Sequence, residues 1–294
     1  MKKVLITGAG GLLGSHIVEK LKNSDRWHVV AASRNPLQTD AQNVTSVTNN
    51  EIFAGTADLS DVNAVIHCAF SRDNSPQALA EGLIFTKNIF DCFKCNGLDN
   101  IINVSSQGLY KQPGQTEFLK ESAPIAPRDA YGVTKLATEL LMDSIFGENT
   151  NYTNVRLSSL NMPQRFTQYF VNNALNGTPV KIMGGKQKVS LMDARDAANG
   201  LIALIDSLPA KWQKAYNLGT GRHTTVEQLA LLTADIVHKK FGYAYPVLEY
   251  AEREVAEYSP VDISAICADT GWSPSCDDEA MITDMIERTL RDRA

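Results

Sequence analysis

The sequence has few cysteines, no long apolar run and no excess of positive charge. Its five cysteines are odd in number and scattered over 294 residues, which argues against a disulfide framework and favours a cytoplasmic location. No apolar run approaches the ~18 residues that a transmembrane helix needs, and residues 4–6 are followed by Thr7 and glycines too soon for a secretory signal. The net charge of -5 offers no basic surface for nucleic acid or an anionic membrane. We therefore expect a small-molecule substrate as the partner.

A metal or redox site is also not indicated. Cys92 and Cys95 form a C-x-x-C pair inside an amphipathic stretch, and no second pair follows at metal-binding spacing. Half-buried structural cysteines in a helix are the better interpretation. The apolar content of 44% and the charged content of 21% are those of an ordinary globular protein, and the length allows a full core divided into two lobes.

Short apolar runs alternate with stretches of helical periodicity along most of the chain. The runs that predict strands are residues 3–7, 29–33, 44–47, 64–69, 101–104, 154–157 and 215–218. Helices are predicted from residue 13, over 77–95, from 131, over 225–237 and over 278–290. This alternation is typical of βαβ units in an α/β fold with a doubly wound parallel sheet. His67 lies among apolar residues of one strand, so we interpret it as a hydrogen-bonded core residue.

A glycine-rich turn follows the first strand. Gly8, Gly11 and Gly14 are spaced by two residues each, and Leu13 and Ile17 then begin a helical repeat. Strand, glycine turn and helix is the order that a dinucleotide site requires, since the backbone can approach a pyrophosphate that faces the helix N-terminus. The spacing differs from G-x-G-x-x-G, so a generic tight turn of an α/β protein remains the alternative.

The end of the second strand bears on the choice of dinucleotide. An acidic residue there binds the ribose 2′-hydroxyl of NAD, whereas a nearby arginine accommodates the 2′-phosphate of NADP. Ser33 and Arg34 occupy this place. The sequence therefore predicts NADP(H) as the preferred cofactor, with NAD(H) still possible. The alternative is that Arg34 is only a solvated loop residue.

Tyr131 and Lys135 are spaced i, i+4, which places them on one face of a helix. An ammonium about 4 Å from a phenol lowers its pKa by roughly three units at an effective dielectric near 20. This predicts a phenol that exchanges protons near pH 7. By itself the pair also occurs by chance on amphipathic helices. Leu136, Leu140 and Leu141 are expected to face the sheet.

The chain as a whole resembles the extended short-chain dehydrogenase/reductase family, which includes UDP-galactose 4-epimerase and nucleotide-sugar 4-keto reductases. The resemblance runs nearly from end to end. It is carried by residues 7–14, 65–69, 105–110, 131–135, 185–187, 196–198, 216–219 and 271–274. It implies a Rossmann-type sheet with a smaller C-terminal substrate lobe. It also implies a homodimer that packs through the tyrosine-bearing helix.

The resemblance assigns roles to particular residues. Tyr131 corresponds to the catalytic acid/base, Lys135 to the residue that holds the nicotinamide ribose, and Ser106 to the group that hydrogen-bonds the reacting hydroxyl. The cofactor-binding residues implied are Gly8, Gly11, Leu12, Leu13, Gly14, Ser33, Arg34, Val47, Cys68, Ala69, Tyr131, Lys135 and Ser158. The substrate-binding residues implied are Ser106, Ser159 and Arg253.

Several positions depart from the family pattern. Gln107 and Gly108 stand where dehydratases carry an Asp-Glu pair, so we do not expect water elimination. Gly82 replaces an asparagine that is frequent in relatives. The acid expected beside adenine is missing, because Ser46 precedes Val47.

Val189 takes the place of the first of two arginines that hold a diphosphate in many relatives. Lys186, Lys188 and Arg195 are the nearby cations that could replace it, and the alternative is that they are only solvated surface charges.

These observations lead to a predicted division and function. Residues 1–161, joined by 189–218, form the dinucleotide-binding domain, and residues 162–188 and 219–294 form the substrate lobe. The expected function is an NAD(P)-dependent epimerase or keto-reductase acting on a sugar, nucleotide-linked in the main hypothesis. The alternative is an NADPH-dependent reductase of a small non-nucleotide carbonyl. A non-catalytic dinucleotide sensor is less well supported, because a sensor has no need of Ser106, Tyr131 and Lys135 together.

Overall fold

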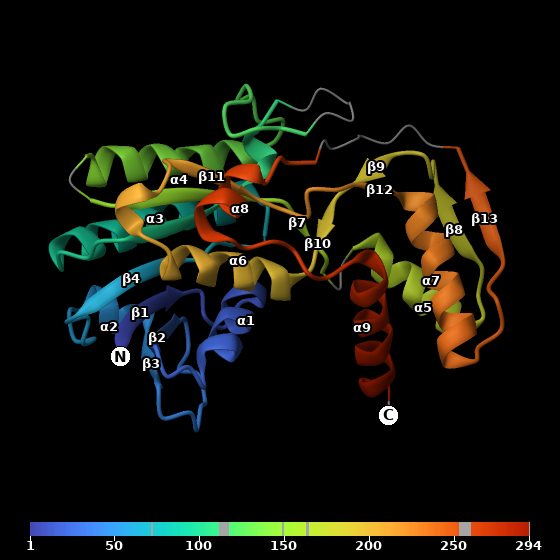
Figure 1. Cartoon of the computed structure of the whole chain (residues 1–294), viewed down its shortest axis with the longest axis horizontal. Helices are drawn as coiled ribbons and strands as arrows, with labels where there is room; N and C mark the ends of the chain where they lie inside the picture. Colours follow the sequence, from blue (N-terminus) through green and yellow to red (C-terminus); the bar gives the residue numbers. More distant parts are fainter. Residues whose placement is uncertain (72, 112–117, 149, 163–164, 253–259, 294) are drawn as a thin grey trace.

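The computed structural model describes residues 1–71, 73–111, 118–148, 150–162, 165–252 and 260–293. Arg253, a predicted substrate contact, lies outside these residues. A parallel sheet of seven strands forms the larger part of the molecule, in the order β11-β6-β5-β4-β1-β2-β3 (Figure 1). Its strands are β1 (Lys2–Thr7), β2 (Trp27–Ser33), β3 (Val44–Thr48), β4 (Val62–His67), β5 (Ile101–Ser106), β6 (Tyr152–Leu157) and β11 (Ala215–Leu218). The prediction of a doubly wound α/β fold is confirmed.

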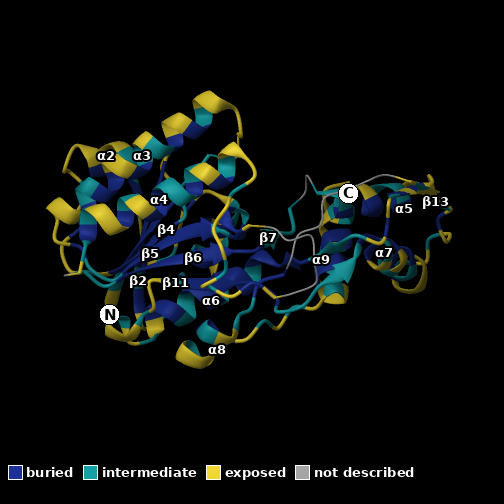
Figure 2. Cartoon of the chain, turned by 90° about the horizontal axis from the view of Figure 1, so that it is seen from above, coloured by how far each residue is buried: buried dark blue, intermediate teal, exposed yellow. Residues whose placement is uncertain are grey.

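Helices cover both faces of this sheet (Figure 2). One face packs against α1 (Leu12–Leu21), α6 (Ala194–Asp206) and α8 (Ser264–Thr270). The other face packs against α2 (Asn49–Phe53), α3 (Pro76–Cys95) and α4 (Ala130–Phe146). Strands covered on both sides are buried nearly throughout, and every residue of β6 is buried. The core of the larger part of the molecule therefore lies within these two helix–sheet layers.

The sheet order reverses at β1, which lies between β2 and β4. In doubly wound sheets the crevice beyond the carboxyl ends of the strands at such a switch point is the usual ligand site. Here the glycine turn follows β1, and Cys68 and Ala69 follow β4. The fold thus brings two of the predicted cofactor-binding segments to one place.

A smaller lobe carries its own core of buried apolar side chains. It contains α5 (Phe166–Asn176), β8 (Val180–Met183), α7 (Val226–Phe241), β13 (Leu248–Ala251) and α9 (Asp278–Arg291), which lie to the right in Figure 1. Short strand pairs lie nearer the large sheet: β7 (Ser159–Leu160) with β10 (Leu191–Met192), and β9 (Lys188–Val189) with β12 (Thr224–Thr225). Two short 3-10 helices, η1 (Gln107–Leu109) and η2 (Pro209–Lys211), complete the elements.

Two details of packing differ from the expectations. Leu140 on α4 is 59% exposed rather than directed at the sheet. Lys135 and Glu139 take buried places on α4 instead, because their charges are paired or hydrogen-bonded there. In addition, Ile266 and Trp272 pack into the core with α1 and α6, so α8 belongs with the larger part.

Helix starts follow from local sequence. The carboxylate of Asp129 accepts a hydrogen bond from the backbone N–H of Gly132 at 2.7 Å, which fixes the first turn of α4. Thr225 and Gln228 form a capping box at the start of α7. Within the described residues, none of the helices combines the length and apolar character needed to cross a bilayer.

Candidate active site

The turn between β1 and α1 is shaped by its glycines. Gly8 has a φ of 70°, and a Cβ on it would lie 2.8 Å from the Cα of Ala69. A Cβ on Gly14 would lie 2.2 Å from the carbonyl oxygen of Gly8. Only glycine permits this close approach of the turn to the chain after β4 and to the start of α1. Gly11 begins α1 without a side-chain cap, and the first turn holds no acidic residue. The positive end of the helix is thus left for an external anion.

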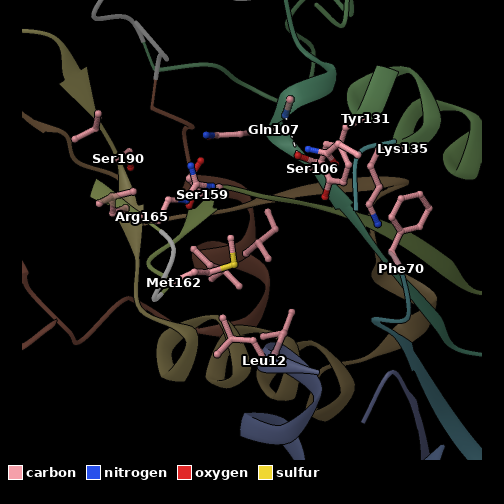
Figure 3. Close-up of a pocket in the computed structure, with 18 of the residues that line it drawn as sticks. Leu12, Phe70, Ser106, Gln107, Tyr131, Lys135, Ser159, Met162, Arg165 and Ser190 are labelled. Carbon is pink, nitrogen blue, oxygen red and sulfur yellow. Dashed lines mark hydrogen bonds between the residues drawn. The ribbon is translucent and has the colours of Figure 1, made fainter. Parts of the chain in front are cut away.

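A cavity of about 890 Å³ opens beyond the carboxyl ends of β1, β4 and β5 and extends toward the smaller lobe. Of the predicted site residues it brings together Gly8, Gly11, Leu12, Leu13, Gly14, Cys68, Ala69, Ser106, Tyr131, Lys135, Ser158 and Ser159. Figure 3 shows Ser106, Tyr131 and Lys135 on one side of this cavity and Leu12 across it.

Three predicted cofactor residues do not line this cavity. The Ser33 hydroxyl, buried at the end of β2, donates a hydrogen bond to the backbone carbonyl of Asn35. Val47 is part of the sheet core, and Arg34 is exposed just beyond β2. The roles predicted for these residues therefore remain predictions.

Ser106, at the end of β5, lies next to Tyr131, in the first turn of α4. The Ser106 hydroxyl accepts the backbone N–H of Gly108 at 3.0 Å and is hydrogen-bonded to Tyr131. Lys135 lies one turn further along α4 and is buried. Its ammonium donates to the carbonyl oxygen of Val104 at 2.9 Å, and Nζ is 4.0 Å from the centre of the Phe70 ring.

The pKa of Tyr131 is raised above its ordinary value, mainly by burial. The hydrogen bond from Ser106 and the charge of Arg165 oppose this rise, while Asp129 adds to it. The prediction that the pKa of Tyr131 is brought near neutrality is therefore wrong for this structure, because burial outweighs the favourable partners. Lys135 is itself affected: burial lowers its pKa to about 8, against the opposing influence of Cys68 and Glu139.

His67 takes the structural role expected of it. It is 3% exposed, and its Nδ1 lies 2.7 Å from the Thr7 hydroxyl. The side chain packs against the rings of Phe85, Phe90 and Phe93. Burial, and to a lesser extent the charge of Lys135, lower its pKa to about 3, so it is neutral at physiological pH.

Comparison with known proteins gives the family. Residues 4–219 match the NAD dependent epimerase/dehydratase family. The chain belongs to this family. A relative from Methanocaldococcus jannaschii described as a putative UDP-glucose 4-epimerase is 24% identical over 299 residues, covering 93% of this chain and 94% of the relative.

Solved structures of the family share the fold. The UDP-glucuronic acid 4-epimerase of Bacillus cereus, determined in complex with UDP-glucuronic acid and NAD, is 20% identical with a TM-score of 0.80. It covers 98% of this chain, and 99% of that chain is matched. The UDP-N-acetylglucosamine 4-epimerase of the same organism has a TM-score of 0.81 at 21% identity, with 100% of each chain covered. The Rossmann-type architecture with a smaller C-terminal region is therefore shown.

The cavity fits the dinucleotide that this epimerase/dehydratase family uses. The uncapped N-terminus of α1 faces one wall of the cavity. Two hydroxyl oxygens that line it, Ser105 Oγ and Ser158 Oγ, are buried without a hydrogen-bond partner among the described residues. Because buried polar atoms rarely stay unpaired, they indicate a polar ligand.

The cavity is also lined by residues that the sequence analysis did not single out. Arg165, Tyr169, Lys181 and Ser190 line it together with Val189. The signal that could have found Arg165 is its position directly before α5, the first helix of the smaller lobe.

The cations proposed to replace the missing arginine do not line this cavity. Lys186 and Lys188 are absent from its walls. Arg195 is bound to Asp193, with Nη2 2.7 Å from Oδ2, and to Asp284. The role suggested for these three residues therefore stays a prediction, and the lysines and arginines that line this cavity are Lys135, Arg165 and Lys181.

Proposed function

We propose that this family member is an NAD(P)-dependent epimerase or keto-reductase that acts on a nucleotide-linked sugar. The observation that carries the proposal is the hydrogen-bonded pair Ser106 and Tyr131, with Lys135 one helical turn away, facing the glycine turn across one cavity. Bound nicotinamide supplies the hydride donor or acceptor. The chain supplies the proton and the placement of the reacting carbon.

The proton chemistry follows from the state of Tyr131. Since burial raises its pKa, the phenol is protonated at neutral pH and is ready to donate to a carbonyl oxygen as hydride arrives. Ser106 holds the same oxygen from the end of β5. In the oxidising direction the phenol must first lose its proton, and the hydrogen bond from Ser106 and the charge of Arg165, which both lower the pKa of Tyr131, favour that loss.

The nucleotide-linked substrate is supported by Arg165 and Lys181 in the cavity wall. Two cations at the substrate end suit the charge of a diphosphate. The second candidate, a reductase of a small non-nucleotide carbonyl, is favoured by Val189, which lines the cavity without charge. Dehydration is not proposed, because Gln107 and Gly108 supply no acid after Ser106.

NADP(H) preference remains part of the proposal. It is supported by Arg34, which is exposed at the end of β2 where the adenosine ribose lies in this fold. The related UDP-glucuronic acid 4-epimerase of Bacillus cereus was determined in complex with NAD, so the proposed NADP(H) preference of this chain is based on Arg34 alone.

We also propose that two copies associate through α3 and α4. Ile84, Val133 and Leu140 are exposed by 61%, 54% and 59%, respectively, on these two adjacent helices. Sedimentation analysis of the protein and of Leu140→Glu tests this: a dimer that becomes a monomer supports it, and a wild-type monomer contradicts it.

A substrate panel with both cofactors tests the function. Cofactor that co-purifies and is not consumed indicates an epimerase, whereas loss of NADPH absorbance with keto-sugars or simple carbonyls indicates a reductase. Tyr131→Phe is expected to lower turnover by about 10²- to 10⁴-fold, with dinucleotide affinity nearly unchanged. Unaltered turnover would contradict the role of Tyr131.

A further inference from the structure

Phe70 directly follows Ala69 at the carboxyl end of β4 and lines the cavity. Its ring presents its face to Lys135, with Nζ 4.0 Å from the ring centre. The ring meets Tyr131 edge to face, with 6.0 Å between centroids and 79° between planes. Figure 3 shows Phe70 beside Lys135, with Tyr131 on the other side of the lysine. Phe70 therefore contacts both residues to which the proton chemistry has been assigned.

Gly82 explains how a ring fits at this place. It is buried in α3, where glycine is otherwise unfavourable. A Cβ on Gly82 would lie 3.4 Å from Cε2 and Cζ of Phe70, which is contact distance, so a longer side chain that continues toward the ring would collide with it. The absence of a side chain at position 82 thus opens the space that Phe70 fills.

We propose that Phe70 is a positioning residue for the Lys135 ammonium, and that Gly82 is the residue that admits it. The ammonium is held between the Val104 carbonyl on one side and the aromatic face on the other. A cation over a ring is attracted by the ring quadrupole, most strongly where water is excluded. The remaining N–H is then directed to the ligand. The inference rests on the proposed function for the role of Lys135 toward cofactor and substrate.

The other titratable groups around Lys135 are neutral or already paired, so they do not mask the attraction between the Phe70 ring and the ammonium. His67 and Cys68 face it from β4 and its end, and both are neutral: the pKa of His67 is about 3, and that of the Cys68 thiol about 12. On α4, Tyr131 is protonated, and among the residues that the structure describes Glu139 is the carboxylate that acts on the lysine. Glu139 is already bound by the Arg156 guanidinium. The Phe70 ring is therefore an attractive partner in direct contact with the ammonium.

The first experiment measures the charge of Lys135 without any ligand. Acetylation of Lys135 by acetic anhydride, followed by mass spectrometry across pH, reports the pKa of its amine in the wild type, Phe70→Leu and Phe70→Tyr. Leucine keeps apolar bulk but removes the ring face, so the pKa is expected to fall by about 0.5–1 pH unit. Tyrosine restores the ring and the wild-type value. An unchanged pKa in Phe70→Leu overturns the inference, whatever the enzyme does.

The second experiment uses turnover on the substrate that the panel identifies. Phe70→Leu is expected to lower kcat about tenfold and to move the alkaline limb of the pH profile to lower pH. Its dinucleotide KM should change less than threefold, and Phe70→Tyr should recover activity. A wild type without turnover or dinucleotide binding contradicts the proposed function. An active wild type matched by Phe70→Leu contradicts the present inference alone.

The contact between positions 70 and 82 is tested by comparing single variants at each position with a double variant. Gly82→Asn is expected to displace the ring and to reproduce the loss in Phe70→Leu, whereas Gly82→Ala should be near wild type because its Cβ only reaches contact distance. Combining Gly82→Asn with Phe70→Ala removes the collision, so the double variant should be no worse than Phe70→Ala. Additive losses, or a harmless Gly82→Asn, contradict the role given to Gly82. Thermal unfolding of each variant separates misfolding from displacement of the ring.

Discussion

Arg156 on β6 binds the carboxylate of Glu139 on α4 in a two-pronged ion pair. Nε lies 3.1 Å from Oε1 and Nη2 lies 2.9 Å from Oε2. The two side chains are only 8% and 7% exposed. Arg156 Nη1 also donates to the Tyr110 hydroxyl at 3.0 Å. Since Glu139 lies one turn after Lys135, this pair fixes the helix that carries the proposed catalytic residues to the sheet.

Glu139→Gln is expected to lower the free energy of unfolding by about 3–5 kcal/mol, because it leaves a buried guanidinium without its counter-charge. Chemical denaturation measures the change. Asp91→Asn is the matched control: it breaks the exposed Lys87–Asp91 pair of α3 and should cost no more than about 0.5 kcal/mol. Equal losses in the two variants would contradict the importance given to burial.

The buried His67 predicts a dependence of stability on pH. Its pKa in the folded protein is about 3, below the ordinary 6.5. The unfolded chain therefore binds a proton first as pH falls, and the folded state loses stability progressively below about pH 6.5. Relative to His67→Gln, the wild type is expected to lose about 1.4 kcal/mol per pH unit between pH 6 and 4.5. Denaturation at several pH values measures the difference, and parallel curves for the two proteins would contradict it.

The sequence predicted the sheet well and the polar packing poorly. Runs such as 64–69 and 101–104 are apolar because parallel strands are covered on both faces, so their pattern is visible without the structure. The buried face of α4 could not be predicted from the sequence. Burial of Lys135 and Glu139 is tolerated only because Val104 and Arg156, which are distant in the sequence, supply a hydrogen bond and an ion pair. Apolar periodicity instead favoured Leu140, which is exposed.

In the candidate site, too, the features with a local sequence signal were predicted and those that depend on the whole fold were not. Glycine spacing and the Tyr131–Lys135 pair are local signals, and the structure brings both to one cavity. The direction of the Tyr131 pKa depends on burial by the whole fold, which no local spacing reports. Phe70 lies after the end of β4 and Gly82 lies in α3, and no spacing pattern in the sequence shows that the two residues are in contact.

Lys135→Met is expected to make the protein more stable but much less active. Burial lowers the pKa of Lys135 to about 8 from 10.5, so at neutral pH the folded protein carries an unfavourable buried charge. Removing it should raise the free energy of unfolding at pH 7 by about 1–3 kcal/mol, while turnover falls at least about 100-fold. The gain should shrink between pH 8 and 10.5, where the wild-type amine loses its proton in the folded state first. A destabilised variant at pH 7 would show that the Val104 contact outweighs burial of the charge.

Arg34 is the residue proposed to favour NADP(H) over NAD(H). If it binds a 2′-phosphate, Arg34→Ala should weaken NADP(H) by about 10- to 100-fold, because a charge-assisted hydrogen bond to phosphate is lost. The affinity for NAD(H), which has a hydroxyl at that position, should change less than about threefold. Lys20→Ala, which removes an exposed charge on α1, is the control for general electrostatic attraction. Titration with NADPH and with NADH, followed by the fluorescence of the reduced nicotinamide, gives the two affinities for each protein. Equal weakening of NADPH and NADH in Arg34→Ala would leave Arg34 as a solvated loop residue, and the related structures' NAD would then be the better guide to this chain.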